Sequence, residues 1–242
     1  MPVDGERPQQ ILRAAAAVIV RLGFDKTTMR DIADEAGVSR GTVYLYFKGK
    51  EEIFDALVYH EWLQYAQIWL KYIEADPRGG TIGGYYRATL RAINSRPLMA
   101  SLMRRDRRII GNYLRKKDNP FAWMQTGAMT MDFIQSLQAA GAVRRDVDPA
   151  VMAHILDIVA YGQLTIGDFQ PPDMFPPYDA VMEAIAEMMD RLLTPENGGD
   201  SEAGKAAFRQ ITTAARARMN QMVRASDEAQ TTAHFGASDD NS

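Results

Sequence analysis

Apolar residues recur at intervals of three and four positions along almost the whole chain, and this spacing constrains the fold more than any other feature. It places apolar side chains on one face of an α-helix, whereas strands need alternation and β-branched runs, which the sequence lacks. In segment 9–22, for example, Ile11, Ala15 and Ile19 share one face, and Gly23 follows as a helix stop. The pattern predicts an all-α protein.

Two short helices are predicted directly after the first. Thr28 stands three residues before Asp31, the spacing of a capping box, and the helix that it opens ends at Gly37. Ser39 can cap another short helix only two residues later. Because so few residues separate them, a tight turn joins the two helices.

Longer helices are predicted in the remainder of the chain. A helix at 50–73 opens with acidic residues, which the helix dipole favours there, and is broken by Asp76 and Pro77. Pro- or Gly-containing breaks separate further expected helices at 81–94, 98–117, 120–140, 149–168 and 178–193. After a linker at 196–200 we expect an amphipathic helix at 205–223 and a disordered tail from residue 226.

Composition narrows the class of protein. The 242 residues are 46% hydrophobic and 24% charged, as in an ordinary soluble globular protein. The net charge of -3 shows no basic excess, so any nucleic acid must be met by a local surface. The absence of cysteine excludes a disulfide scaffold, a thiolate metal site, a cysteine nucleophile and thiol redox chemistry.

The N-terminal sequence lacks the basic and apolar regions of a secretory signal. Its longest apolar run, 14–20, is far short of the roughly 20 residues that span a bilayer. We therefore expect a soluble, cytoplasmic protein that makes no membrane contact.

No constellation of residues supports catalysis. The three histidines, His60, His154 and His234, are far apart, and no Gly-rich phosphate loop is present. We expect a protein that is not an enzyme and that holds neither a metal nor a cofactor.

The two short helices, covered by the first, have the geometry of a helix-turn-helix that binds DNA. The second helix of such a motif lies in the major groove, with its N-terminal residues at the base edges. Arg40 can place its fork on guanine, and Thr42 can bond a base or offer its methyl group to thymine. The phenolic and ammonium donors that follow suit phosphates: Tyr44, Tyr46, Lys48 and Lys50.

The N-terminal quarter also resembles the TetR/AcrR family of bacterial transcriptional regulators. The matching residues are dense and ordered: Ile11-Leu12, Ala14-Ala15, Gly23-Phe24, Thr27-Thr28, Asp31-Ile32-Ala33, Ala36-Gly37-Val38-Ser39, Gly41-Thr42-Val43-Tyr44, Tyr46-Phe47 and Lys50-Glu51-Glu52. Elsewhere the chain matches only in its pattern of helices. The resemblance implies a homodimeric repressor that grips a palindromic operator and holds an effector in its C-terminal domain.

The resemblance also implies roles for single residues. Thr28 would cap its helix and touch phosphate, and Tyr44 with Tyr46 would reach the DNA backbone. Lys50 would anchor the linking helix on phosphate. The residues expected to face bases are Ser39, Arg40, Gly41 and Thr42. The implied domains are a helix-turn-helix at 1–50, an effector and dimerisation domain at 51–193 with 51–73 as the linking helix, and an extension at 194–242.

Candidate effector contacts are Met, aromatic and acidic side chains of the C-terminal helices: Tyr113, Trp123, Met124, Met131, Asp157 and Tyr161. For any single one of them, a place in the hydrophobic core is the simpler interpretation. Asp157 shares a polar stripe with His154, Tyr161 and Asp168, and such an acid either meets a ligand or pairs across the dimer interface. The resemblance places dimer contacts on helices 149–168 and 178–193, which favours the interface.

The segment Arg96 to Lys117 is rich in arginine and lysine. A solvated helix face or a second DNA-facing surface explains it more simply than a site for an anionic effector.

We therefore predict a sequence-specific regulator that binds a palindromic duplex as a homodimer and is released by a small, largely apolar effector. A ligand that shifts the far end of helix 50–73 would also move the recognition helices. The alternative is a DNA-organising or protein-interaction module without a small-molecule effector.

Overall fold

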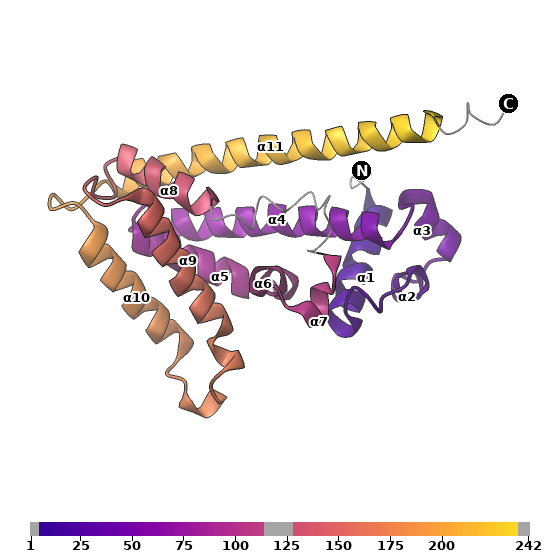
Figure 1. The fold of residues 1–242 in the computed structure, drawn as a ribbon, viewed down its shortest axis with the longest axis horizontal. Coiled ribbons are helices and arrows are strands. Elements are labelled where there is room, and N and C mark those ends of the chain that lie inside the picture. The colour runs from indigo at the N-terminus through magenta and orange to yellow at the C-terminus, as the bar shows by residue number, and fades with distance from the viewer. Residues whose placement is uncertain (1–4, 114–127, 237–242) are drawn as a thin grey trace.

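The computed structural model describes residues 5–113 and 128–236, and all regular elements in these two ranges are helical (Figure 1). This confirms the predicted all-α class. The α-helices are, in chain order, α1 (Glu6–Leu22), α2 (Met29–Glu35), α3 (Arg40–Tyr46), α4 (Lys50–Ala75), α5 (Ile82–Asn94), α6 (Pro97–Arg104), α7 (Arg107–Ile110), α8 (Ala128–Ala139), α9 (Pro149–Thr165), α10 (Tyr178–Leu193) and α11 (Ser201–Gly236). Two short 3-10 helices, η3 (Ile166–Asp168) and η4 (Pro172–Met174), lie between α9 and α10.

The first three helices form at the predicted positions because their caps and apolar faces agree. Ile11, Leu12 and Ile19 of α1 are buried on one side of the helix. Thr28 and Asp31 form the expected capping box of α2, and the Ser39 side chain caps α3. Local signals and burial thus specify the same structure.

Helix α4 connects the two ends of the molecule. Its 26 residues make it about 39 Å long, since an α-helix rises 1.5 Å per residue. Its first turns bury Ile53, Phe54 and Leu57 in one hydrophobic cluster, whereas Trp69 and Ile73 belong to a second. The same rigid element is therefore part of both cores.

The first hydrophobic cluster extends beyond the three N-terminal helices. Besides α1 to α4, it includes Leu98 and Leu102 of α6, Ile110 of α7, and Tyr113. The boundary expected at residue 50 is thus not a boundary between cores.

The single helix predicted at 98–117 is wrong, because the chain forms α6 and α7 there instead. Arg105 adopts the left-handed conformation, with φ 54°, and ends α6. Asp106 then caps α7 by accepting the backbone N–H of Arg108 at 2.9 Å. A non-glycine residue rarely adopts positive φ, and neither Gly nor Pro stands at this position. The sequence therefore gives no sign of the break. Residues 114–127, which include the first eight residues of the expected helix 120–140, lie outside the described residues, and α8 (Ala128–Ala139) falls within the rest of that helix.

The C-terminal helix is longer than expected. We predicted a helix at 205–223 and disorder from 226, but α11 begins at Ser201 and continues to Gly236. It runs antiparallel to α4 and lies beside it (Figure 1). Phe208 and Met219 of α11 are both buried against the body.

The start of α11 is fixed by a close approach between two glycines. A Cβ built on Gly204 would stand 2.1 Å from the Gly80 carbonyl oxygen, and one on Gly80 would stand 1.8 Å from the Ser201 carbonyl oxygen. The Gly80 N–H also donates to the Ser201 hydroxyl at 3.1 Å. Because any side chain would separate the two backbones, only glycine permits this seat for α11.

Helix α9 packs on α8 and α6, helix α10 packs on α5, and both expose apolar side chains (Figure 1). On α9, Val151, Ile155 and Ile158 are 58%, 44% and 57% exposed, and on α10 Met188 and Leu192 are 61% and 65% exposed. Residues 149–168 are also long and apolar enough to cross a membrane by length and composition. Exposed apolar faces of this kind mark a surface that another body covers.

Candidate DNA-binding interface and effector region

Helix α3 packs through one face and presents the other to solvent. Val43 and Phe47 are buried, whereas Arg40 is exposed and Tyr44 is 48% exposed. At the helix start the Ser39 hydroxyl accepts the Thr42 N–H at 3.0 Å, and the two hydroxyl oxygens are 2.9 Å apart. Ser39, Arg40 and Gly41 thus form a small, polar, accessible helix start, which suits approach to base edges.

Leu45 is 82% exposed on the same helix, and the sequence analysis did not select it. Tyr46 beside it packs partly against the first cluster. Three consecutive large residues on a seven-residue helix cannot all face one core, and that was the signal for an outward apolar side chain. An exposed leucine here can contact thymine methyl groups or sugars.

Helix α2 is held firmly beneath α3. The Thr28 hydroxyl accepts the Asp31 N–H at 3.2 Å and donates to the Asp31 carboxylate at 2.7 Å, while the Thr28 N–H donates to that carboxylate at 2.9 Å. Hydrogen bonds from the Thr28 side chain and backbone hold the pKa of Asp31 below its usual value. The Gln10 side chain donates to the Ala36 carbonyl at 2.7 Å and joins α2 to α1.

The Lys50 ammonium is occupied within the protein. It donates to the carbonyl oxygens of Phe24 and Asp25 at 3.1 Å each and of Thr27 at 3.3 Å, and lies 4.8 Å from the Phe24 ring centroid. These bonds use the three donors of an ammonium group. The side chain ties the loop after α1 to the start of α4, whereas Lys48 is exposed.

The N-terminal domain is joined to the residues directly after α7 by ring contacts and hydrogen bonds. The Phe24 ring lies 4.7 Å from the Phe54 ring and 5.6 Å from the Tyr113 ring, measured between centroids. The Tyr113 hydroxyl donates to the Asp55 carboxylate. The carboxylate of Asp25 receives the Asn112 N–H at 3.3 Å. Displacement of α7 would therefore act directly on the loop between α1 and α2.

The four predicted effector residues that the structure describes do not converge on one site. Tyr113 is buried in the first cluster, beside Phe24, and Met131 packs partly against the second cluster. Tyr161 is 51% exposed on α9. Asp157 is half-buried and accepts the Thr130 hydroxyl at 2.8 Å, and burial raises its pKa. Trp123 and Met124 lie outside the described residues.

The arginine-rich segment divides into paired and exposed side chains. Arg96 donates to both carboxylate oxygens of the buried Glu61, at 2.8 and 2.5 Å, which joins α6 to α4. Arg108 pairs with Asp106 at 2.9 Å, and Arg104 and Arg107 are exposed. The described part of the segment thus combines a structural pair with a solvated face, and residues 114–117 lie outside it.

A cleft of about 340 Å³ lies between α4, α5, α8 and α11. Five aromatic side chains line it, together with two arginines of α11 at its rim: Trp62, Tyr65, Trp69, Tyr85, Phe133, Arg209 and Arg216. None of the four predicted effector residues that the structure describes, Tyr113, Met131, Asp157 and Tyr161, is among its lining residues.

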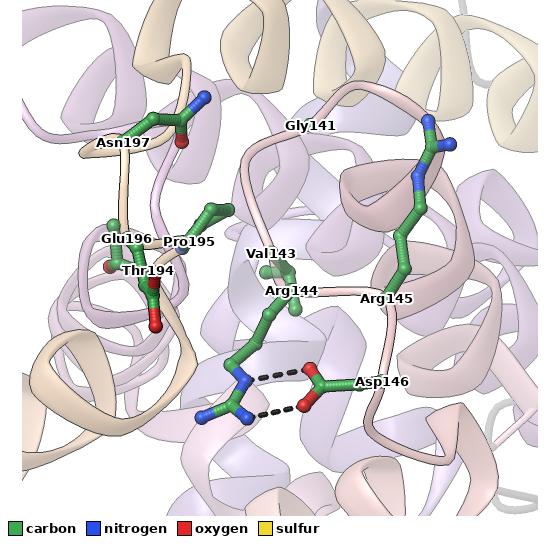
Figure 2. A pocket seen from close by; sticks show the side chains of 9 residues that line it. All are labelled: Gly141, Val143, Arg144, Arg145, Asp146, Thr194, Pro195, Glu196 and Asn197. Carbon is green, nitrogen blue, oxygen red and sulfur yellow. Dashed lines mark hydrogen bonds and ion pairs between the residues drawn. The ribbon is translucent and has the colours of Figure 1, made fainter.

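A second hollow, of about 540 Å³, lies between the α8–α9 and α10–α11 connections (Figure 2). Its Arg144 is already paired with Asp146, at 2.7 Å from Nε, and also donates to the Leu192 carbonyl at 3.3 Å. Arg145 points away and donates to the Gln138 carbonyl at 3.0 Å (Figure 2). These guanidinium groups already bond to the loop itself. The hollow therefore has fewer polar groups available to bind a ligand.

Comparison with known proteins finds relatives of the N-terminal domain. Residues 11–57 match the model of the family described as bacterial regulatory proteins, tetR family. The regulator YfiR of Bacillus subtilis, itself described as uncharacterized, is 49% identical over 53 residues, which are 22% of this chain and 26% of YfiR. This match thus spans about a quarter of that relative's length.

Two further comparisons extend beyond the N-terminal domain. The transcriptional repressor KstR2 of Mycolicibacterium smegmatis is 29% identical over 152 residues, covering 59% of this chain and 70% of that protein. The solved structure of FadR of Bacillus subtilis with stearoyl-CoA matches with a TM-score of 0.56 at 18% identity, over 75% of this chain and 96% of that one. At that identity the likeness shows the fold alone. Residues 11–57 are thus similar to the N-terminal domain of bacterial regulatory proteins of the tetR family, and the longer matches show that the rest of the chain shares the fold of such regulators.

Proposed function

We propose that this protein is a DNA-binding transcriptional repressor that grips a palindromic operator and is released by a small-molecule effector. The observation that carries the proposal is the exposed start of α3, where Ser39, Arg40 and Gly41 stand on a helix fixed by buried Val43 and Phe47. A recognition helix needs this combination of a rigid base and an accessible polar end.

The DNA contacts proposed from this geometry fall into two groups. Ser39, Arg40, Gly41 and Thr42 face the bases, with Arg40 on guanine. Side chains beside them meet the phosphates and set the register: Thr28, Tyr44, Tyr46 and Lys48. Lys50 supports this surface by holding the loop before α2, rather than by contacting phosphate with a free ammonium.

We propose that two chains pair through α9 and α10. The exposed Val151, Ile155 and Ile158 lie on one side of α9, and Met188 and Leu192 are four residues apart on α10. Pairing these faces between two copies buries them in a four-helix interface, and a twofold dimer matches a palindrome. The same burial accounts for the apolar character of residues 149–168 without a membrane.

The proposed domains are the helix-turn-helix at 1–50, the effector and dimerisation domain at 51–193, and the extension at 194–242. Release follows from their connection, because α4 is packed into both cores and α7 touches the loop after α1. An effector must prefer the DNA-incompetent arrangement, since equal affinity for both states shifts nothing. Stearoyl-CoA in the FadR structure and the name of KstR2 support a repressor with an organic effector. Such a regulator acts in the cytoplasm without catalysing a reaction.

The proposal is tested by selecting duplexes from a random-sequence pool with the full chain and footprinting the winners. We expect an inverted repeat with half-sites one helical turn apart, about 34 to 36 Å. Retention of all duplexes alike, without an enriched sequence, would favour the alternative of a DNA-organising module and overturn the proposal.

A further inference from the structure

The C-terminal helix α11 builds one wall of the aromatic cleft described above. Arg209, Thr212, Thr213, Ala215 and Arg216 line it from α11, whereas Trp62 to Leu70 line it from α4. Positions 209, 212 and 216 are spaced by three and four residues and so share one helix face. The cleft therefore exists only because α11 lies along α4.

Five aromatic rings line the cleft, and they contact one another. The Trp62 and Tyr65 rings are 5.3 Å apart, Trp69 and Phe133 are 5.5 Å apart, and Tyr85 and Phe133 are 5.3 Å apart. Tyr65 and Tyr85 are only partly buried, because they face the open space. The cleft has a volume of about 340 Å³, which is within the size range of small-molecule sites.

Among the described residues that line the cleft, the two guanidinium groups of α11 carry the only formal charges. Burial raises the pKa of Tyr85 to about 12 and that of Tyr65 still further, so both phenols stay neutral. Arg209 is paired with Glu74 at 2.6 Å, but no described carboxylate pairs with Arg216. The rim thus carries one uncompensated positive charge beside an apolar interior.

We propose that this cleft binds a small apolar organic anion, with its rings or chain between α4 and α11 and its acidic group at Arg216. The Trp69 indole N–H donates to the Thr89 hydroxyl at 3.1 Å, and the Tyr85 hydroxyl interacts with Thr130, which bonds Asp157. Because these polar groups are already engaged behind the rings, the ligand's body needs no hydrogen-bonding groups. Its charge is recognised at the rim alone.

The occupied cleft would act on α4 at its middle, between the two hydrophobic clusters. Trp62 is shared with the small cluster that includes Met219 of α11, and Tyr59 one turn earlier donates to the Asn220 side chain. A ligand that moves α11 therefore also moves the part of α4 that leads to the DNA-binding domain. This regulatory consequence rests on the proposed function, whereas the binding itself does not.

The probe for the test is 1-anilinonaphthalene-8-sulfonate, and its uncharged control is N-phenyl-1-naphthylamine, which has the same rings without the sulfonate. Both are titrated into the full chain, with excitation of tryptophan and detection of probe emission, because Trp62 and Trp69 stand in the wall. We expect one molecule of probe per chain and energy transfer from tryptophan.

Three variants locate the probe. Arg216→Gln should weaken the anionic probe about two- to fivefold, the worth of an exposed ion pair, and leave the neutral probe unchanged. Arg218→Gln is the matched control, since Arg218 is exposed on α11 but does not line the cleft, and it should change neither. Ala66→Phe should fill the cleft and weaken both probes more than tenfold, with the melting temperature checked by circular dichroism.

Equal losses from Arg216→Gln and Arg218→Gln would show attraction to the general charge of α11 and overturn the proposal. Unchanged binding by a folded Ala66→Phe variant would place the probe elsewhere and overturn it as well. Affinity for a selected duplex is measured separately with each variant, so a failure of DNA binding cannot be mistaken for a failure of the cleft.

Discussion

The backbone N–H of Phe24 donates a 2.7 Å hydrogen bond to the carbonyl oxygen of Ile109. This bond joins the end of the first helix to α7, across 85 residues of sequence. Gly23 beside it has φ 83°, and a Cβ there would stand 2.2 Å from the Arg108 carbonyl oxygen. The N-terminal helices are thus seated directly on α7.

The first prediction concerns this seat. Gly23→Ala should lower the free energy of unfolding by more than the about 1 to 2 kcal/mol of a left-handed residue, because the methyl group also strikes a backbone oxygen. Gly37→Ala is the control, since Gly37 also has positive φ but nothing lies within 4 Å of a Cβ there. Chemical denaturation measures the free energy of unfolding of both variants. Equal losses would show that α7 moves aside to accommodate the methyl group at no cost.

The second prediction separates two lysines at the DNA surface. Lys48→Ala should reduce the slope of log affinity against log salt by about 0.9, the effect of one lost phosphate contact. Lys50→Ala should leave that slope unchanged and lower the melting temperature, because its ammonium holds three carbonyl groups of the protein. A salt titration that shows the same change for both would return Lys50 to the phosphate contacts.

The third prediction concerns base reading by α3. Arg40→Ala should cost about 1 to 3 kcal/mol on the selected operator and relax the preference at one base pair. Binding is compared on duplexes altered at each position of a half-site. A loss of equal size on all of them would make Arg40 a phosphate contact.

The fourth prediction concerns dimerisation. Ile158→Asp should dissociate the dimer at micromolar concentration without loss of helix content, since it places a charge in the proposed apolar interface. Leu45→Asp, at an apolar residue of α3 that is even more exposed than Ile158 (82% against 57%), should leave the dimer intact. Analytical ultracentrifugation of both variants decides, and a dimeric Ile158→Asp variant would contradict the pairing of α9.

The fifth prediction concerns Asp157, whose pKa in the folded chain is raised by burial. The folded state then binds the proton more tightly than the unfolded state, so stability falls as the pH rises from the ordinary pKa through the raised one. Asp157→Asn should therefore gain stability relative to the native chain at neutral pH, and lose that advantage below about pH 4. Unfolding followed at several pH values measures it, and a constant difference would contradict the assignment.

The sequence predicted correctly those helix ends that are set by interactions between residues close together in the chain. The Thr28–Asp31 capping box is an example, and the predicted helix 178–193 agrees with α10 at both ends. The break at Arg105 was missed because a left-handed arginine is held by its tertiary setting and not by its own preference. The continuation of α11 past residue 226 was missed because its polar composition resembles that of a disordered tail.

Of the two candidate sites, the one formed by sequence neighbours could be predicted and the one formed by distant residues could not. The start of α3 could be predicted because its residues are neighbours in sequence. The aromatic cleft could not, because Trp69, Phe133 and Arg216 meet only after α11 has docked on α4. Nothing in the spacing of these residues indicates that docking, which depends on the backbone contact between Gly80 and Gly204.

The shared core of the N-terminal helices has a consequence for chimeric regulators. Ile110 and Tyr113 complete the cluster that buries Phe24 and Phe54. If the proposed DNA-binding domain were cut at residue 50 and fused to the effector-binding domain of another regulator, that apolar surface would be exposed to solvent. A transplant that keeps its operator preference must therefore carry α6, α7 and Tyr113 with it, or redesign the recipient's matching surface to replace them.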